Sequence, residues 1–415
     1  MNSVSTYFNR LKRSNSVRRL MSGTAWSLIG ASVSRVSNLV SLTIIARLLS
    51  DHGFGLVSIV IQTMGFVGVF AGAGLGATLT RFVAQYREDD PDRAGRVIVL
   101  ISMISYMALI LMGLLVILLS SSLATNVFQE KALNGLIRVG ILIMIASVVR
   151  TLLDGILAGL EDFRAISISS IIHGIVTILA CVVLTMNFRE SGALFGLALG
   201  LFASCTASVC FLFKPARKFN LLAGCFTAVS EVKVLSSFAA PSVLTGIIYA
   251  PFAWAAIALL ARSPDGISEV GGYNAAYIWQ GPIMFIPMIV AGVSIPMLTQ
   301  AWEARQIVKF KKIVLLNLFA MLTISIVLAG AVAFFSEQLL ALSGQEFKRF
   351  ATPLIILSIA APIHGVARVL TSALYAMGHA WTVLAVNLLA GFVLVGSAVF
   401  FVAEMVRRGW RKVFY

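Results

Sequence analysis

The dominant pattern along the chain is a series of long apolar runs separated by short polar or basic stretches. An α-helix needs about 20 apolar residues to cross the hydrocarbon core of a bilayer. Runs of at least that length occur at 21–46, 54–80, 96–120, 134–160, 165–187, 192–213, 234–261, 273–299, 313–335, 351–377 and 381–403. Mean hydropathy is +0.96 and only 12% of residues are charged, against roughly 25% in soluble domains. The pattern predicts an all-α polytopic membrane protein.

Basic side chains are concentrated on alternate connections between the predicted spans. The chain has 32 Lys and Arg against 17 Asp and Glu, a net charge of +15. With the N-terminus inside, 18 basic residues fall on cytoplasmic segments and 7 on the opposite loops. This bias is the positive-inside pattern, so we expect a multi-pass membrane protein with a cytoplasmic N-terminus. The charge is explained by topology and does not indicate a nucleic-acid partner.

The second half of the sequence repeats features of the first at one constant offset, which aligns Arg150 with Arg368 and Gly53 with Gly271. Internal repeats are common in membrane transporters. We expect a basic cytoplasmic segment (1–20), a six-helix bundle (21–213), a basic cytoplasmic linker (214–233) and a five-helix bundle (234–415). The repeat also predicts a twelfth helix beginning near position 410, where the sequence ends. Two explanations are open: a shortened form of a twelve-helix protein, or loss of the last helix.

Three arginines lie well inside apolar runs, where each costs about 2.5–3.5 kcal/mol on insertion scales. Arg150 has Asp154 four residues later on the same helix face, whereas Arg368 has no acid near it in sequence. These side chains are either pins between helices or the basic lining of a cavity that binds an anion. Guanidinium groups bind phosphate bidentately, so a phosphate-bearing substrate would supply the missing negative charge. The candidate cavity residues are Arg35, Asn38, Arg150, Asp154, His364 and Arg368.

Motifs typical of enzymes and of nucleotide-driven pumps are missing. The run AGAGLGATLTR at 71–81 has glycines spaced as in a phosphate-binding loop, but it ends an apolar span and follows no strand. The four cysteines lack metal-ligand spacing. We therefore expect no enzyme activity, no metal site and no cofactor. Four amide side chains inside the spans are expected to hydrogen-bond between helices: Gln62, Gln280, Asn317 and Asn387.

Two stretches resemble a known family. ARLLSDHGFGLVSIVIQTMGFVGVFAGAGLGATLTRFVAQY at 46–86 resembles the first helical hairpin of the Wzx-type flippases of polysaccharide biosynthesis. LLDGILAGLEDFRAISI at 152–168 resembles the exit of their fourth helix, with small residues before a short aromatic and basic turn. The resemblance extends over about 20–400 and is strongest in the N-terminal half.

The resemblance implies the fold of the multidrug/oligosaccharidyl-lipid/polysaccharide (MOP) exporter superfamily, in which two bundles surround a central cavity as in the multidrug (MATE) transporters. It implies a protein of the bacterial inner membrane that translocates an undecaprenyl-diphosphate-linked oligosaccharide by alternating access, for O-antigen, capsule or exopolysaccharide synthesis. Partners would be that lipid-linked glycan, the bilayer and other membrane proteins of polysaccharide assembly. The alternative is a cation-coupled multidrug antiporter of the same superfamily, which should carry an acidic cavity.

Overall fold

The computed structural model describes residues 15–72, 74–216, 247–248 and 250–408. Within these ranges the chain consists of helices and turns and contains no strand. The first half holds α2 (Asn15–Gly72), α3 (Leu75–Tyr86), α4 (Pro91–Ser122), the π-helical turn η1 (Leu123–Val127), α5 (Leu133–Gly159) and α6 (Phe163–Ala216). The second half holds α10 (Ala250–Ala261), α11 (Gly266–Ile278), α12 (Gln280–Glu303), α13 (Ile307–Phe334), α14 (Ser336–Ala341), η4 (Gln345–Phe350), α15 (Ala351–Ala376) and α16 (Ala380–Arg408).

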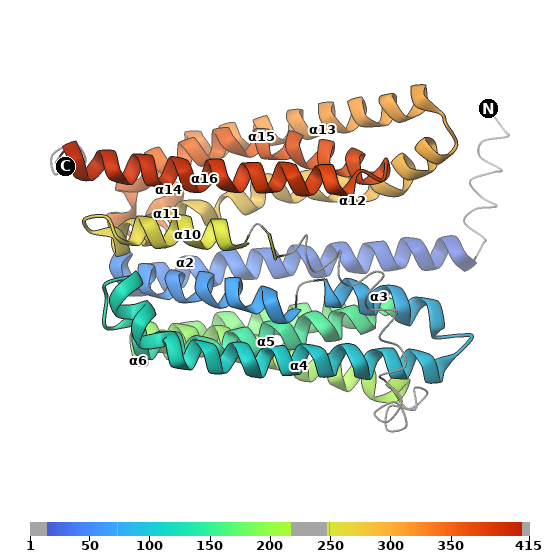
Figure 1. Cartoon of the computed structure of the whole chain (residues 1–415), viewed down its shortest axis with the longest axis horizontal. Helices are drawn as coiled ribbons and strands as arrows, with labels where there is room; N and C mark the ends of the chain where they lie inside the picture. Colours follow the sequence, from blue (N-terminus) through green and yellow to red (C-terminus); the bar gives the residue numbers. More distant parts are fainter. Residues whose placement is uncertain (1–14, 73, 217–246, 249, 409–415) are drawn as a thin grey trace.

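Seven helical stretches of the described chain are long and apolar enough to cross a membrane. Two of them, Ala25–Tyr86 and Phe163–Phe213, reverse direction and each contain two of the predicted spans (Figure 1). The expected all-α, multi-span membrane protein is therefore confirmed. Most of the predicted segments 1–20 and 214–233, and the start of the predicted run 234–261, lie outside the described residues, as does the predicted twelfth helix.

Single residues with unusual backbone angles make the sharp reversals. The chain turns at Ser50 (φ 62°) within α2 and at Arg189 (φ 50°) within α6. Helix α4 begins where Pro91 follows Asp90, whose carboxylate accepts a hydrogen bond from the Arg93 N–H at 2.9 Å. An aspartate cap followed by proline is a strong helix start, since proline has no N–H to leave unsatisfied. These turns are short, so the helical segments on either side of each turn run antiparallel.

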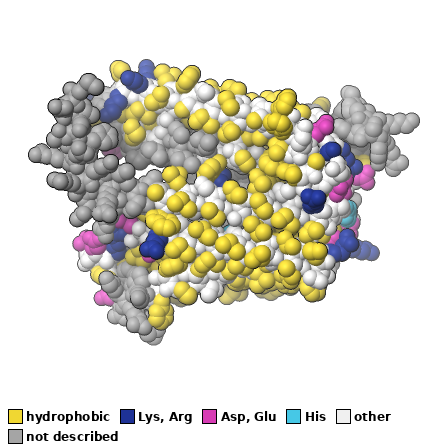
Figure 2. Space-filling view, turned by 180° about the vertical axis from the view of Figure 1, so that it is seen from behind, with side chains coloured by type: hydrophobic (Ala, Val, Ile, Leu, Met, Phe, Trp, Pro, Cys, Tyr) yellow, Lys and Arg dark blue, Asp and Glu magenta, His cyan; other side chains and the backbone are white. Residues whose placement is uncertain are grey.

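The helices form two layers (Figure 1). Helices α3 to α6 lie in one layer, helices α12, α13, α15 and α16 lie in the other, and the first segment of α2 runs between them with α10 and α11. On the face that Figure 2 shows, hydrophobic side chains cover the middle of the molecule, and most charged side chains lie toward its two ends. This surface matches a protein that places its apolar middle in lipid.

Among the described residues, the buried hydrophobic cluster that the two halves of the chain share lies toward one end of the molecule. There, Phe54 of α2, Val270 of α11 and Phe347 of η4 belong to one buried cluster. Toward the other end the buried clusters are separate: one contains Leu79 and other residues of the first half, and one contains Leu298 and other residues of the second half. The layers are thus joined at the end that carries Asp51, which we call the joined end.

The helix bounds agree with the internal repeat. Helix α5 begins at Leu133 and helix α15 begins at Ala351, which is the position that the repeat aligns with Leu133. Glycines explain how the two halves approach at the joined end. A Cβ at Gly55 would collide with the backbone of Ile267, and a Cβ at Gly271 would collide with the backbone of Asp51. The second segment of α2 and helix α11 therefore cross closely, near the positions that the repeat makes equivalent.

Candidate functional site

A cavity of about 1170 Å³ lies between the two layers. It is lined by both segments of α2 and by residues of α11, α12, α13, α15 and α16. Four of the six predicted site residues line it: Arg35, Asn38, His364 and Arg368. Each half of the chain supplies two of these residues, so a ligand that contacts them would bridge the halves.

The charged side chains of the cavity are basic. Arg35 of α2 lies over the ring of Phe285 of α12, 5.1 Å from its centroid, in a cation–π contact across the halves. Arg368 and His364 are exposed and stand four residues apart on α15, so they share a helix face. Within the described part of the chain, the cavity lining contains no aspartate or glutamate. The cavity is therefore suited to an anion.

Neutral amide groups line another part of the same cavity. Gln62 of α2 donates a hydrogen bond from Nε2 to Oδ1 of Asn274 on α11, at 3.2 Å. Gln280, at the start of α12, lines the cavity as well. The expected bond between helices is confirmed for Gln62, and for Asn317, whose Oδ1 accepts from Ser294 Oγ at 2.9 Å. The sequence did not predict that Gln62 and Gln280 line the cavity, although the repeat aligns these two residues with each other.

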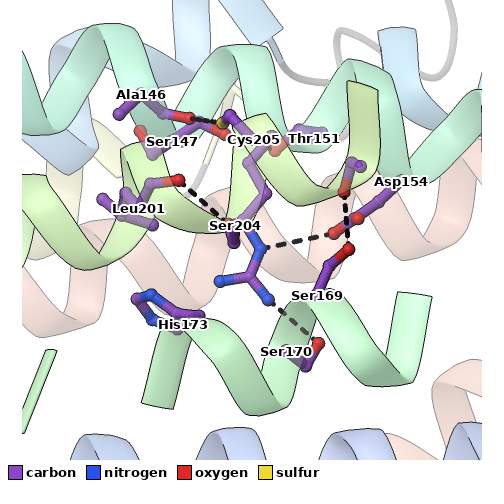
Figure 3. A network of polar contacts seen from close by, with 12 residues as sticks. Ala146, Ser147, Thr151, Asp154, Ser169, Ser170, His173, Leu201, Ser204 and Cys205 are labelled. Atoms are coloured by element: carbon purple, nitrogen blue, oxygen red, sulfur yellow. Dashed lines mark hydrogen bonds and ion pairs between the residues drawn. The ribbon is translucent and has the colours of Figure 1, made fainter. Parts of the chain in front are cut away.

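Arg150 and Asp154 do not line this cavity; they lie inside the first half, between α5 and α6. The Arg150 guanidinium is 3.5 Å from the Asp154 carboxylate (Nε to Oδ2) and donates from Nη2 to Ser170 Oγ at 3.1 Å. Figure 3 shows Asp154 in this ion pair, with Ser170 and His173 close to it. The two charged side chains are 15% and 32% exposed, respectively. Their role in substrate binding stays a prediction.

Side chains tie the two halves at the joined end. Arg349 of η4 forms an ion pair with Asp51, beside the turn in α2. Next to this pair, Phe54 packs edge-on against Phe347, with ring centroids 6.2 Å apart. Phe54 also lines the cavity, so it forms part of the cavity wall at the joined end, with the fully buried Phe347 behind it. Sequence reasoning did not single out this group, because its members come from opposite halves of the chain and share no local pattern.

A second tie lies near the same end. Arg262, just after α10, donates to the backbone carbonyls of Asn126 at 2.8 Å and Val127 at 2.9 Å, in η1. Toward the other end, the hydrogen bonds of Arg87 stay within the first half, to the Gly159 carbonyl and to Glu161. Among the described residues, hydrogen bonds between the halves thus occur at the joined end and further along α2, at Gln62–Asn274 and Trp254–Thr63.

Comparison with known proteins decides the family. Residues 20–302 match the family described as polysaccharide biosynthesis protein. The chain belongs to this family. It is 26% identical over 370 residues to the EPS I polysaccharide export inner membrane protein EpsE of Ralstonia solanacearum, covering 87% of this chain and 82% of that one. It is 28% identical over 180 residues, 43% of each chain, to the lipid III flippase of Escherichia coli.

Solved structures show the same fold in the MOP superfamily. An outward-facing multidrug resistance MATE transporter superposes with a TM-score of 0.65 at 17% identity, covering 95% of this chain and 90% of that one. An inward-facing member superposes with a TM-score of 0.60 at 14% identity, covering 92% and 99%. These likenesses confirm the expected MATE-like architecture of this polysaccharide biosynthesis protein.

Proposed function

We propose that this family member moves an undecaprenyl-diphosphate-linked saccharide from the cytoplasmic to the outer leaflet of the bacterial inner membrane. The single observation that carries the proposal is the basic cavity, in which Arg35 and Arg368 come from opposite halves and the described lining holds no carboxylate. The names of the relatives, an export protein and a lipid-linked precursor flippase, point to the same class of cargo.

The chemistry of the cavity suits a diphosphate. Guanidinium groups form bidentate, charge-assisted hydrogen bonds with phosphate oxygens, roughly twice as strong as neutral ones. These bonds are strengthened further where the local dielectric constant is low. The volume of about 1170 Å³ exceeds the roughly 300–1,000 Å³ of sites for drug-sized ligands. It leaves room for sugars beside the phosphates.

The joined end suggests how access would alternate. With the N-terminus in the cytoplasm, as the positive-inside pattern favours, the Asp51–Arg349 end faces outward. A cavity closed there by Phe54, with Phe347 packed behind it, would receive cargo from the cytoplasmic side. Release to the outer leaflet would then require the Asp51–Arg349 pair to part while the separate cores of the two halves come together at the other end.

This step has its own test. In a variant with Ser58, which lines the cavity, replaced by cysteine, a membrane-impermeant maleimide should react slowly from the outside. Adding Asp51→Asn should speed the labelling about two- to fivefold, the effect of losing one solvent-exposed ion pair. Unchanged labelling would contradict the role of the pair in closure, and Glu130→Gln, in the loop after η1, serves as the control.

The alternative, a cation-coupled multidrug antiporter, fits the cavity less well. A cationic drug would meet Arg35 and Arg368 without a carboxylate in the described lining, and like charges repel. The multidrug transporters superpose at only 14–17% identity, which is evidence of shared fold. One solved MOP superfamily transporter, from Pyrococcus furiosus, is described as having a binding pocket of reversed polarity that suggests a different function.

Flipping in proteoliposomes tests the proposal directly. Lipid-linked saccharides extracted from the producing bacterium would be placed in the inner leaflet and their arrival outside followed with a lectin. Wild-type protein should speed transfer, and the double variant Arg35→Ala/Arg368→Ala should abolish the gain. Lys312→Ala, an exposed basic residue of α13 outside the cavity, is the matched control. Export of a cationic dye without any lipid transfer would overturn the proposal in favour of the antiporter.

A further inference from the structure

Gln280 is a buried amide without a hydrogen-bond partner for its nitrogen. The residue is 6% exposed, and its Nε2 makes no hydrogen bond with the residues that the structure describes. Buried polar groups are almost always satisfied, and the exceptions occur where a ligand or a functional demand explains them. Because Gln280 lines the cavity, a turn of its buried amide toward the cavity would let a ligand held there satisfy the nitrogen.

A backbone acceptor lies two positions earlier in the chain. Helices α11 and α12 are separated by a break at Trp279. Pro282 has no N–H, so it cannot donate the helical hydrogen bond to the carbonyl of Ile278. Both Ile278 and Pro282 line the cavity. Interrupted helices commonly border the substrate sites of transporters, because a carbonyl without its helical partner is tolerated where it faces a polar cavity.

The opposite half of the chain supplies a further amide, Gln62. Nδ2 of Asn274 donates to the Val270 carbonyl at 2.9 Å, and its Oδ1 accepts from Gln62. This arrangement holds the Gln62 side chain against α11 and leaves its Oε1 outside that bond. Gln62 and Gln280, which the repeat makes equivalent, thus contribute amides to one cavity from α2 and α12.

We propose that Gln280, the Ile278 carbonyl and Gln62 form a glycan subsite, distinct from the basic part of the cavity that takes the diphosphate. The inference rests on the proposed function. A sugar hydroxyl both donates and accepts, so it can bond a carbonyl and an amide N–H at once. Phosphate oxygens only accept, and they select the guanidinium groups instead. Tyr277, which lines the cavity one turn from Asn274, adds an aromatic surface beside these groups.

The subsite predicts a selective defect. Binding of two probes would be compared in detergent: synthetic undecaprenyl diphosphate, and the lipid-linked saccharides extracted from the producing bacterium. Gln280→Leu should weaken binding of the saccharide-bearing lipid about 3- to 10-fold, the effect of one or two lost hydrogen bonds. It should leave binding of undecaprenyl diphosphate unchanged. Gln62→Leu is a second variant, which carries the test if Gln280→Leu fails to fold.

Two controls separate the possible failures. Asn317→Leu removes an amide that pairs with Ser294 away from the cavity lining, so it should lower stability without changing the ratio of the two affinities. Arg368→Ala should weaken both probes alike. If Gln280→Leu and Gln62→Leu leave that ratio at its wild-type value, the glycan subsite is overturned, whereas the proposed binding of the diphosphate in the cavity is not. If wild-type protein binds neither probe, the proposed function itself is overturned.

Discussion

Arg150 and Arg368 occupy equivalent positions of the two halves, yet they have opposite surroundings. Arg150 is held by Asp154 and Ser170 inside the first half. Arg368 is exposed on the cavity and makes no hydrogen bond or ion pair through its side chain with the described residues. The repeat aligns Ser372 with Asp154 and Leu388 with Ser170. Both partners of Arg150 are therefore missing around Arg368.

The difference teaches that an arginine in a membrane helix takes its role from its neighbours. An arginine with a carboxylate one turn away can satisfy its charge within the fold. An arginine without that carboxylate must find an anion elsewhere. Ser372, which stands where the first half has Asp154, illustrates this difference. Its hydroxyl donates to the backbone carbonyl of Arg368 at 3.0 Å, so it provides no negative charge for the guanidinium.

The largest expected effect is on transport by Arg368→Ala. Loss of the bidentate contact with phosphate should lower flipping about 10- to 100-fold. Arg368→Lys should retain part of the flipping activity, because lysine keeps the charge but cannot form the bidentate contact. Flipping at equal protein in proteoliposomes is the measurement. If Arg150→Ala, with folded protein matched, is equally defective, the two arginines do not differ in role.

The second prediction transplants the missing carboxylate. Ser372→Asp places an acid four residues after Arg368, as Asp154 stands to Arg150, and should pair with the guanidinium. Flipping should fall about tenfold because the substrate phosphate must now displace an internal partner. Ser372→Asn, of nearly the same size but neutral, is the control. Equal activity of both variants would show that pairing at this position does not compete with substrate.

The third prediction concerns stability. Arg150→Ala leaves Asp154 without its partner, and we expect the free energy of unfolding to fall by about 1–3 kcal/mol, less than for a fully buried pair because Asp154 is 32% exposed. The apparent melting temperature in detergent should drop, whereas that of Arg368→Ala should not. The double variant Arg150→Ala/Asp154→Ala should regain part of the loss, since the uncompensated charge is gone. A double variant less stable than Arg150→Ala would contradict this account.

The smallest effect is expected from Asp154→Asn. The amide can still accept a hydrogen bond from Arg150, so stability should fall by about 1 kcal/mol or less. Flipping should decrease less than with Arg368→Ala. If Asp154→Asn melts normally but has a transport defect as severe as that of Arg368→Ala, Arg150 and Asp154 take part in substrate transport.

The sequence by itself determined the helical membrane architecture and the repeat. Both follow from patterns that can be read along the chain. A span is recognised from its own apolar residues and turn signals, and the repeat from one constant offset that aligns positions such as Arg150 and Arg368. It also identified Arg35, Asn38, His364 and Arg368, because polar side chains inside apolar runs stand out against the cost of burying them in lipid.

Only the tertiary structure decided which of these residues share a cavity. Whether an arginine is pinned within one half depends on the neighbouring helix, where Ser170 bonds Arg150 but the equivalent position near Arg368 holds Leu388. The ion pair of Asp51 and Arg349 joins residues from opposite halves of the chain, and Gln280 is notable only because its packed surroundings leave Nε2 without a partner among the described residues. Such properties arise from the way helices distant in sequence pack, and no local pattern contains them.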